Sequence, residues 1–393
     1  MPNKPSEQTL AVRAGLETDE QHGAVVPPLH LSSTFSYEGY GKPRRYDYTR
    51  TGNPTRDALA EALGELEGGV GATVTCSGMA AITLVCQLVD PGDLVIAPND
   101  CYGGTFRLLT GFAERGLLRL ELIDQTDAAE LDRTLALNPR LVWVETPTNP
   151  LLRIVDLKKL SHRLLHTDAL LAVDNTFLSP VLQRPIEFGA DLVVHSTTKY
   201  LNGHSDVVGG AVVATTLELH EQMQYWANAL GLTGAPFDSF LTLRGLRTLH
   251  ARMRLHEENA TALADLAVSH PAVRCAYYPG LRDHAGHTVA KRQQRGFGGM
   301  LSLELAGGEP AAKAFLEALQ YFSLAESLGG VESLAAHPWT MTHGVVDEDS
   351  KRSAGLCEGL IRLSAGIEAT ADLVADVEHA LHCAPDAAES ALD

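Results

Sequence analysis

Two residues suited to covalent cofactor chemistry follow apolar strands in the middle of the chain. Lys199 comes shortly after the apolar run at residues 192–194, and Asp174 directly follows another at residues 170–173. An amine placed there can form a Schiff base with pyridoxal phosphate (PLP), and a carboxylate can hold the pyridine nitrogen protonated so that the ring accepts electrons. A lysine with only a surface role would fit poorly after so apolar a strand. The pair therefore predicts a PLP enzyme.

Two strand ends offer groups that could bind a phosphate. Ser77, Gly78 and Met79 follow an apolar strand and open a helix, where backbone N–H groups can bind an anion and a glycine permits close approach. Ser196 and Thr198 add two hydroxyls. Taken alone, the first motif is better explained as an ordinary helix N-cap. The glycine fingerprint G-x-G-x-x-G of a dinucleotide site does not follow this strand, which disfavours a nicotinamide dehydrogenase.

Tyr102 and Asn149 lie at the ends of two further strands. The ring of Tyr102 could stack on a planar cofactor and its phenol could carry protons, although a tyrosine with one face on the core is an equal interpretation. The two glycines after it, and Arg107 one helical turn beyond, favour the functional interpretation. Asn149 lies in the Pro-rich turn at residues 145–150 and could bond a ring hydroxyl.

Three other residues need a reason for their positions. Arg362 lies inside the apolar strand at residues 360–364, where a guanidinium requires an anion. A substrate carboxylate would supply it, and a buried structural salt bridge would do so equally well. Tyr48 and Arg50 lie in the N-terminal arm without an evident structural role, and simple surface exposure would also explain them.

The order of elements predicts an α/β protein. Residues 61–250 alternate short apolar strands with helices, a pattern typical of a large, mostly parallel sheet that binds ligands at the carboxyl ends of its strands. Residues 251–270 form a long amphipathic helix, which opens a smaller α+β C-terminal domain at 251–393. Residues 1–60 form an irregular arm that we expect to contact a neighbouring subunit.

Composition excludes several classes of partner. The net charge of −18 argues against nucleic acid and anionic membranes, although a small anionic substrate remains possible. No apolar signal core or membrane-length segment is present, and six scattered cysteines without C-x-x-C indicate buried, reduced thiols in a cytoplasmic protein. His284 and His287 lack a zinc-binding pattern, so we expect no metal site.

Together these residues resemble the Cys/Met-metabolism family of PLP-dependent enzymes. The resemblance covers nearly the whole chain apart from its two ends. The motifs that carry it are Asp47-Tyr48-Thr49-Arg50, Gly52-Asn53-Pro54-Thr55-Arg56, Cys101-Tyr102-Gly103-Gly104, Glu145-Thr146-Pro147, Val173-Asp174-Asn175-Thr176-Phe177, the run from Ser196 through Lys199 to Asp206, Leu324 to Gly330, and Arg362-Leu363-Ser364. The family implies fold type I, the aspartate-aminotransferase-like fold, with PLP as cofactor. It also implies a homotetramer built as a dimer of dimers, with active sites shared across each dimer.

The resemblance implies a role for each matching residue. Lys199 would bind PLP covalently and move protons, and Tyr102 would stack on the ring. The remaining cofactor residues would be Asp174 at the pyridine nitrogen, Asn149 at the ring hydroxyl, Ser77, Gly78, Met79, Ser196 and Thr198 at the phosphate, and Tyr48 and Arg50 reaching the phosphate from a partner subunit. The substrate residues would be Asp47, Arg107, Glu326, Ser327 and Arg362, with Arg362 at the α-carboxylate.

Within the family, bacterial members that synthesise cystathionine are the most similar in several stretches, including residues 149–153 and 234–239. We expect γ-replacement of O-succinyl-L-homoserine with L-cysteine, a transsulfuration step toward methionine. Cleavage of cystathionine by a γ-lyase is the alternative, because Arg107 and Glu326 suit either activity. A non-catalytic protein that kept the fold is disfavoured by the intact Lys199 and Asp174. Ala365 departs from the family pattern, which has Thr or Val there, and nothing in the sequence explains it.

Overall fold

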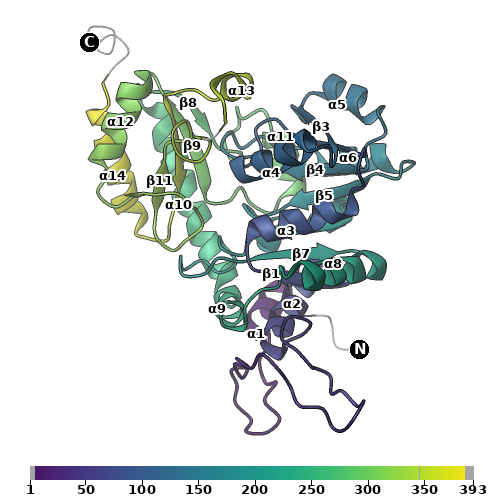
Figure 1. Cartoon of the computed structure of the whole chain (residues 1–393). Coiled ribbons are helices and arrows are strands. Elements are labelled where there is room, and N and C mark those ends of the chain that lie inside the picture. Colours follow the sequence, from purple (N-terminus) through teal and green to yellow (C-terminus); the bar gives the residue numbers. More distant parts are fainter. Residues whose placement is uncertain (1–4, 345, 386–393) are drawn as a thin grey trace. The chain divides into compact units, whose positions relative to one another are not determined.

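The computed structural model describes residues 5–344 and 346–385 and divides into two compact units (Figure 1). Unit 1 consists of Met1–Val89 and Leu170–His250, and unit 2 of Asp90–Ala169 and Ala251–Asp393. Unit 1 takes its strands from two segments that lie far apart in the sequence, whereas the strands of unit 2 come from residues 90–169 in one sheet and from residues 251–393 in the other.

Unit 1 contains four neighbouring strands in the order β1-β7-β6-β5. Their bounds are β1 Gly71–Thr75, β5 Leu170–Asp174, β6 Leu192–His195 and β7 Gly210–Ala214. β5 and β6 are parallel, with Val173 opposite Val193, whereas β7 runs antiparallel to both β6 and β1. Every residue of β6 and β7 is buried, as the wholly apolar runs predict.

Helices flank these strands. They are α1 Glu7–Arg13, α2 Pro54–Glu67, α3 Gly78–Val85, α7 Ser179–Leu182, α8 Leu217–Leu230 and α9 Pro236–Leu246, with short 3-10 turns η1 Cys86–Leu88 and η2 Pro185–Phe188. α2 starts at an Asn53 cap with Pro54 in the first turn, and ends where Gly68 adopts φ 82°. α1 is an unpredicted helix in the arm, where Ala11 is buried and Ser6 accepts from the N–H of Thr9.

Unit 2 contains two sheets. The first has parallel strands in the order β4-β2-β3, with helices α4 to α6 between and after them. Their bounds are β2 Leu94–Pro98, α4 Gly103–Glu114, β3 Arg119–Ile123, α5 Ala128–Leu135, β4 Leu141–Glu145 and α6 Leu157–Leu164. β3 was not predicted, because it alternates exposed polar with partly buried apolar residues and lacks an apolar run.

The second sheet of unit 2 has the order β10-β11-β12-β9-β8. The bounds are α10 Leu249–Ser269, β8 Val273–Tyr277, α11 His287–Gln293, β9 Met300–Leu305, α12 Gly308–Ala318, β10 Ser323–Leu324, β11 Leu334–Ala336, α13 Glu348–Ser353, β12 Leu360–Ser364 and α14 Thr370–Cys383. α12 and α14 lie side by side against this sheet, and their apolar faces share a core with β9 and β12 (Figure 1). The long helix predicted at residues 251–270 and the strand predicted at 360–364 are confirmed by α10 and β12, whereas β8, β10 and β11 were not predicted.

The cysteines correct one expectation. All six are free thiols, but Cys76 and Cys383 are exposed, because Cys76 comes after the last residue of β1 and Cys383 lies on the outer face of α14. Among the described residues, no helix is long and apolar enough to cross a membrane, and no group of three or more His, Cys, Asp or Glu could hold a metal ion.

Candidate active site

The predicted site residues fall into two sets, one in each unit. Lys199 belongs to unit 1, in the turn that follows β6. Its N–H donates to the carbonyl of Ser196 at 3.3 Å, and its carbonyl accepts from the N–H of Gly203 at 2.8 Å. The side chain is half-buried. The amine is thus carried by a hydrogen-bonded turn at the carboxyl end of a buried strand, as predicted.

The start of α3 has the geometry that can bind an anion. Ser77 is an N-cap whose Oγ accepts from the N–H of Ala80 at 3.0 Å, and its carbonyl accepts from Ala81 at 3.1 Å. The N–H groups of Gly78 and Met79 have no acceptor within the described ranges, so they can donate to a phosphate. The N-cap and phosphate interpretations of Ser77 are therefore compatible.

Gly78 is required by close packing at this helix start. A Cβ added there would lie 2.8 Å from Cβ and 2.9 Å from Oγ of Ser196. The hydroxyl of Ser196 has no partner in the part of the chain that is described, whereas Thr198 Oγ1 donates to the carbonyl of Gly209 at 3.2 Å and accepts from its N–H at 3.0 Å. The two predicted hydroxyls therefore differ: one is available to a ligand and the other also holds the turn.

Asp174 ends β5 and accepts from the N–H of Thr176 at 2.9 Å. Burial raises the pKa of Asp174, while its bonds with Thr176 and the charge of His195 lower it. His195 is fully buried with Nε2 2.6 Å from Oε1 of the equally buried Glu67, which also accepts from Asn175 at 2.9 Å. A carboxylate in such surroundings needs a cationic partner to stay ionised, and the pyridinium N–H of bound PLP would be one.

The N-terminal arm holds Asp47, Tyr48 and Arg50, of which Asp47 is half-buried and the other two are exposed. Asp47 Oδ1 accepts from the N–H of Tyr48 at 2.6 Å, and the Arg50 guanidinium lies over the Tyr48 ring at 5.3 Å. Arg50 Nε also donates to Asn228 Oδ1 at 3.0 Å. These contacts keep the phenol and guanidinium together at the surface of the chain.

In unit 2, Tyr102 is placed at the first turn of α4 by Glu145. The Tyr102 N–H donates to Glu145 Oε2 at 2.8 Å, while Oε1 accepts from Thr105 Oγ1 at 3.1 Å and from Trp143 Nε1 at 3.2 Å. The Tyr102 side chain stays 42% exposed, which favours the functional interpretation over a ring packed on the core. The Glu145 motif was noticed in the sequence, but this helix-positioning role was not predicted.

Arg362 is buried in β12, and its hydrogen bonds join three predicted residues. Nη1 donates to Asn149 Oδ1 at 3.0 Å, and Nη2 donates to the carbonyl of Ser327 at 2.7 Å. Neither contact is a salt bridge, so these two bonds orient the guanidinium without neutralising it. Ser327 has φ 89°, an uncommon conformation for a non-glycine residue and one found often at ligand sites.

Electrostatic interactions place the other predicted substrate residues near Tyr102. Burial raises the pKa of Tyr102, the charges of Arg107 and Arg362 lower it, and that of Glu326 raises it. Arg107 and Glu326 are both exposed, and each can meet a charged substrate group. The unit 2 set therefore brings together Tyr102, Asn149, Arg107, Glu326, Ser327 and Arg362.

His343 is a site residue that the sequence did not reveal. It is buried next to Arg362, and burial followed by the Arg362 charge lowers its pKa to about 4. It is therefore neutral at pH 7, which avoids a second positive charge beside the guanidinium. The only sequence signal was a histidine in a segment without helical or strand periodicity.

The chain matches known proteins over nearly its full length. Residues 8–382 match the family described as Cys/Met metabolism PLP-dependent enzyme. Cystathionine gamma-synthase of Escherichia coli is 52% identical over 377 residues, covering 96% of this chain and 98% of that protein. Two solved structures are also similar. The cystathionine gamma synthase of Xanthomonas oryzae in complex with cystathionine has TM-score 0.95 at 56% identity (96% and 98% covered), and cystathionine gamma-lyase of Lactobacillus plantarum has TM-score 0.93 at 41% identity (97% and 99% covered).

Proposed function

Because the chain belongs to the Cys/Met metabolism family of PLP-dependent enzymes, we propose that it makes L-cystathionine by γ-replacement. Succinate leaves the γ-carbon of O-succinyl-L-homoserine, and the sulfur of L-cysteine takes its place. The arrangement around Arg362 carries the proposal, since a guanidinium oriented by Asn149 and Ser327 can bind the α-carboxylate that both substrates possess. The high identity to cystathionine gamma-synthases supports the same reaction.

Bound PLP supplies an electron sink for the charge released at the substrate α-carbon. Lys199 removes the α-proton and then a β-proton, which allows succinate to leave, and later returns protons to these carbons after sulfur addition. Asp174 would keep the pyridine nitrogen protonated, and Tyr102 and Asn149 would hold the ring and its hydroxyl. The phosphate is held by Ser77, Gly78, Met79, Ser196 and Thr198.

The substrate residues divide the charged groups of the two substrates between them. Arg362 and Ser327 take the α-carboxylate, Arg107 takes the distal carboxylate of the succinyl group, and Glu326 takes the amino group of the incoming cysteine. Asp47, Tyr48 and Arg50 act at the active site of a partner subunit. Only Arg107 distinguishes a succinyl from an acetyl group, because acetyl has no second carboxylate.

Cleavage of cystathionine is the rival activity, since it uses the same proton transfers. The similarity to a γ-lyase structure is the observation that favours this rival activity. The discriminating experiment supplies the purified PLP-loaded protein with O-succinyl-L-homoserine and L-cysteine, or with cystathionine alone. We expect cystathionine and succinate in the first reaction and little turnover in the second. Rapid release of cysteine and 2-oxobutyrate from cystathionine, without synthesis, would favour the lyase.

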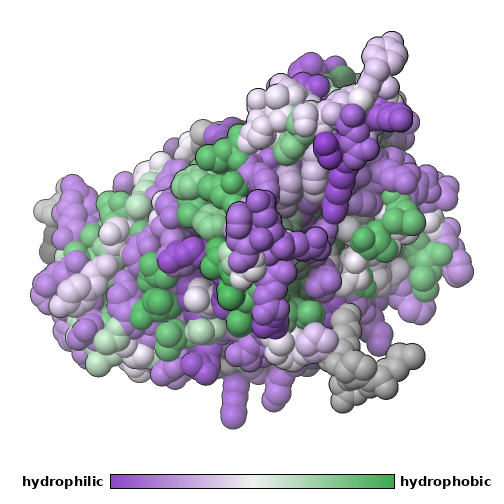
Figure 2. Space-filling view, turned by 90° about the horizontal axis from the view of Figure 1, so that it is seen from below, coloured by the Kyte–Doolittle hydropathy of each residue, from purple (hydrophilic) through white to green (hydrophobic). Residues whose placement is uncertain are grey.

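We further propose a cytoplasmic homotetramer, a dimer of dimers. Hydrophobic residues are exposed among hydrophilic ones on the face drawn in Figure 2, and the arm at residues 1–60 exposes Val25, Leu31 and Tyr40. Such exposed apolar side chains are typical of a covered interface. Residues 61–250 would then act as the PLP-binding domain and 251–393 as the C-terminal domain.

Mixing two inactive variants tests the shared site. Lys199→Ala disables a subunit's own amine, and Arg50→Ala disables the residue it lends to its partner. If sites are shared, each mixed dimer regains one of its two sites. An equimolar mixture, in which random exchange makes about half of the dimers mixed, then regains about a quarter of wild-type activity per chain. A mixture that stays inactive after subunit exchange, verified by native mass spectrometry, would contradict sharing.

A further inference from the structure

An arginine outside the proposed reaction is linked to the α-carboxylate site through one short segment. Residues 148–153 include Asn149, which binds Arg362, and end on Arg153. Arg153 is 24% exposed in its side chain and lines a cavity of about 1180 Å³ in unit 2. Nothing in the proposed reaction requires a guanidinium at this position.

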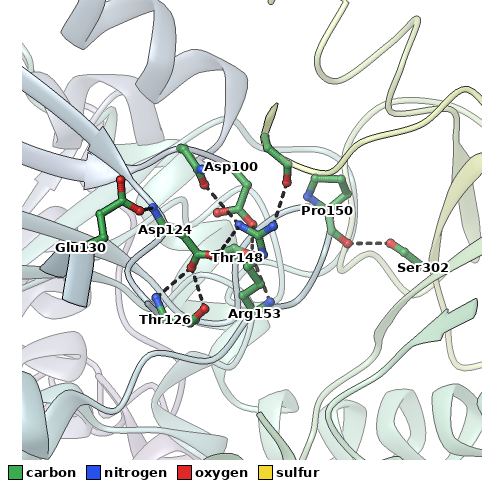
Figure 3. Close-up of polar contacts among 10 residues, drawn as sticks. Asp100, Asp124, Thr126, Glu130, Thr148, Pro150, Arg153 and Ser302 are labelled. Atoms are coloured by element: carbon green, nitrogen blue, oxygen red, sulfur yellow. Dashed lines mark hydrogen bonds and ion pairs between the residues drawn. The ribbon is translucent and has the colours of Figure 1, made fainter. Parts of the chain in front are cut away.

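The Arg153 guanidinium is held by four groups (Figure 3). Nη1 donates to Asn99 Oδ1 at 3.2 Å and lies 3.3 Å from Asp124 Oδ2, and Nη2 donates to the carbonyl of Ala354 at 2.9 Å. Nε lies 3.8 Å from Oδ2 of the buried Asp100. Arg153 therefore joins the residues that follow the carboxyl ends of β2 and β3 to the C-cap of α13, as a planar fork with several donors can.

Thr148, Asp100 and Arg153 also hold the backbone of residues 148–153 through hydrogen bonds. Thr148 Oγ1 donates to Asp100 Oδ2 at 2.6 Å and accepts from the Arg153 N–H at 3.0 Å. The Thr148 N–H donates to the Arg153 carbonyl at 3.0 Å. Between them, the buried Leu152 has φ 55°, a conformation that persists only when the surroundings impose it.

The opposite side of the segment contacts the substrate-carboxylate strand. The carbonyl of Pro150 accepts from Ser302 Oγ at 2.7 Å (Figure 3). Ser302 of β9 is paired directly with Arg362 of β12, and Arg362 donates to Asn149. The position of Asn149 is therefore set from one side by Ser302 and Arg362, and from the other by Thr148, Asp100 and Arg153.

We propose that Arg153 is a positioning residue for the α-carboxylate site: by holding residues 148–153, it keeps Asn149 in place to orient Arg362. The inference rests on the proposed role of Arg362. It assigns a function to the Asn149–Arg153 stretch, whose similarity to cystathionine-forming enzymes was visible in the sequence.

The test compares two ligands that differ only in the carboxylate. L-Norleucine and its decarboxylated counterpart, pentylamine, are titrated into the PLP-loaded protein, and binding is followed by the visible absorbance of the cofactor. Arg153→Met should weaken norleucine binding at least about tenfold and leave pentylamine binding unchanged. Arg163→Met is the matched control, because Arg163 lines the same cavity, is 25% exposed and pairs with Asp132 instead. It should change neither affinity.

A double-mutant cycle identifies the route of the effect. In an Asn149→Ala background, adding Arg153→Met should weaken norleucine binding by less than about a further twofold, because the side chain that Arg153 positions is already absent. Effects that multiply would overturn the inference, as would a norleucine preference that survives in Arg153→Met. A wild-type protein without any preference would overturn the Arg362 assignment as well.

If Arg153→Met does not fold, Arg153→Lys performs the test, since it keeps the positive charge beside Asp100 but loses the fork. We expect a smaller loss of norleucine binding of about threefold or more, again with pentylamine unaffected. Thermal unfolding of each variant shows whether ligand preference and global stability change separately. Equal norleucine and pentylamine losses in Arg153→Lys would overturn the positioning role.

Discussion

The two sets of site residues offer different kinds of chemical group to their ligands. In unit 1, the groups offered to a phosphate are uncharged, namely the backbone N–H groups of Gly78 and Met79 and the hydroxyl of Ser196, and a hydrogen-bonded turn carries Lys199. In unit 2, they are charged side chains, with Arg107, Glu326 and Arg362 all acting on Tyr102. Backbone donors suit a constant phosphate, whereas side chains can vary with the substrate. The difference suggests that unit 1 residues set cofactor binding and unit 2 residues set substrate choice.

Removing the amine should have the largest effect. Lys199→Ala should lower kcat by about a thousandfold or more, since the proton transfers at two carbons lose their base. The variant should still fold and bind PLP without a covalent link. Borohydride treatment followed by mass spectrometry should attach the cofactor to the wild type only. Substantial residual turnover would mean that another group transfers the protons.

Arg362→Lys should impair the use of substrate without changing cofactor binding. A lysine cannot donate to Asn149 and Ser327 while binding a carboxylate bidentately, so we expect kcat/KM to fall about 100-fold, or ~3 kcal/mol. PLP affinity should not change. Arg352→Lys is the control, because Arg352 is an exposed arginine paired with Glu358 at 2.8 Å. A loss of PLP binding in Arg362→Lys would break the comparison.

Gly78→Ala should weaken cofactor binding without changing substrate binding. The added methyl would lie 2.8 Å from Ser196 Cβ and push the helix start from the turn, so PLP affinity should fall about tenfold. Gly111→Ala in α4 is the control, since no atom lies within 4 Å of a Cβ there, and it should raise stability by up to ~1 kcal/mol. Unchanged cofactor binding in Gly78→Ala would show that this helix start is not the phosphate site.

His343→Asn should have a small effect at neutral pH and a measurable one in acid. The folded pKa of about 4 is below the ordinary 6.5, so the unfolded chain binds a proton first as pH falls below 6.5. This histidine therefore costs up to about 3 kcal/mol of stability by pH 4 and nothing above pH 6.5. Denaturant unfolding of the variant should show a shallower decline between these values, and a parallel decline would contradict the shift.

Chemically active residues that lie at the ends of strands are the part of the site that the sequence could reveal. Lys199 and Asp174 were identifiable because each follows an apolar run, Ser77 because it lies between a strand and a helix, and Arg362 because a charge interrupts an apolar strand. α10 and β12 were predictable from their own residue patterns. The family resemblance supplied the roles of Arg107 and Glu326, which no local pattern indicates.

The remaining features depend on contacts between distant segments. Glu145 places Tyr102 from a strand that lies far along the chain, and the pKa of His343 depends on burial by other elements. Arg153 looked like part of a family stretch, but its bonds to Asn99 and Ala354 join three separate regions. β3 escaped notice because an exposed edge of a sheet does not need an apolar run.

One paired measurement tests most directly whether unit 1 residues set cofactor binding and unit 2 residues set substrate choice. The dissociation constant of PLP and the KM for O-succinyl-L-homoserine, the latter at saturating PLP, are determined for Gly78→Ala and Arg362→Lys. The account predicts a crossover, in which Gly78→Ala raises the first constant about tenfold and leaves the second within about twofold, while Arg362→Lys does the reverse. Two variants that change both constants to the same extent would contradict it.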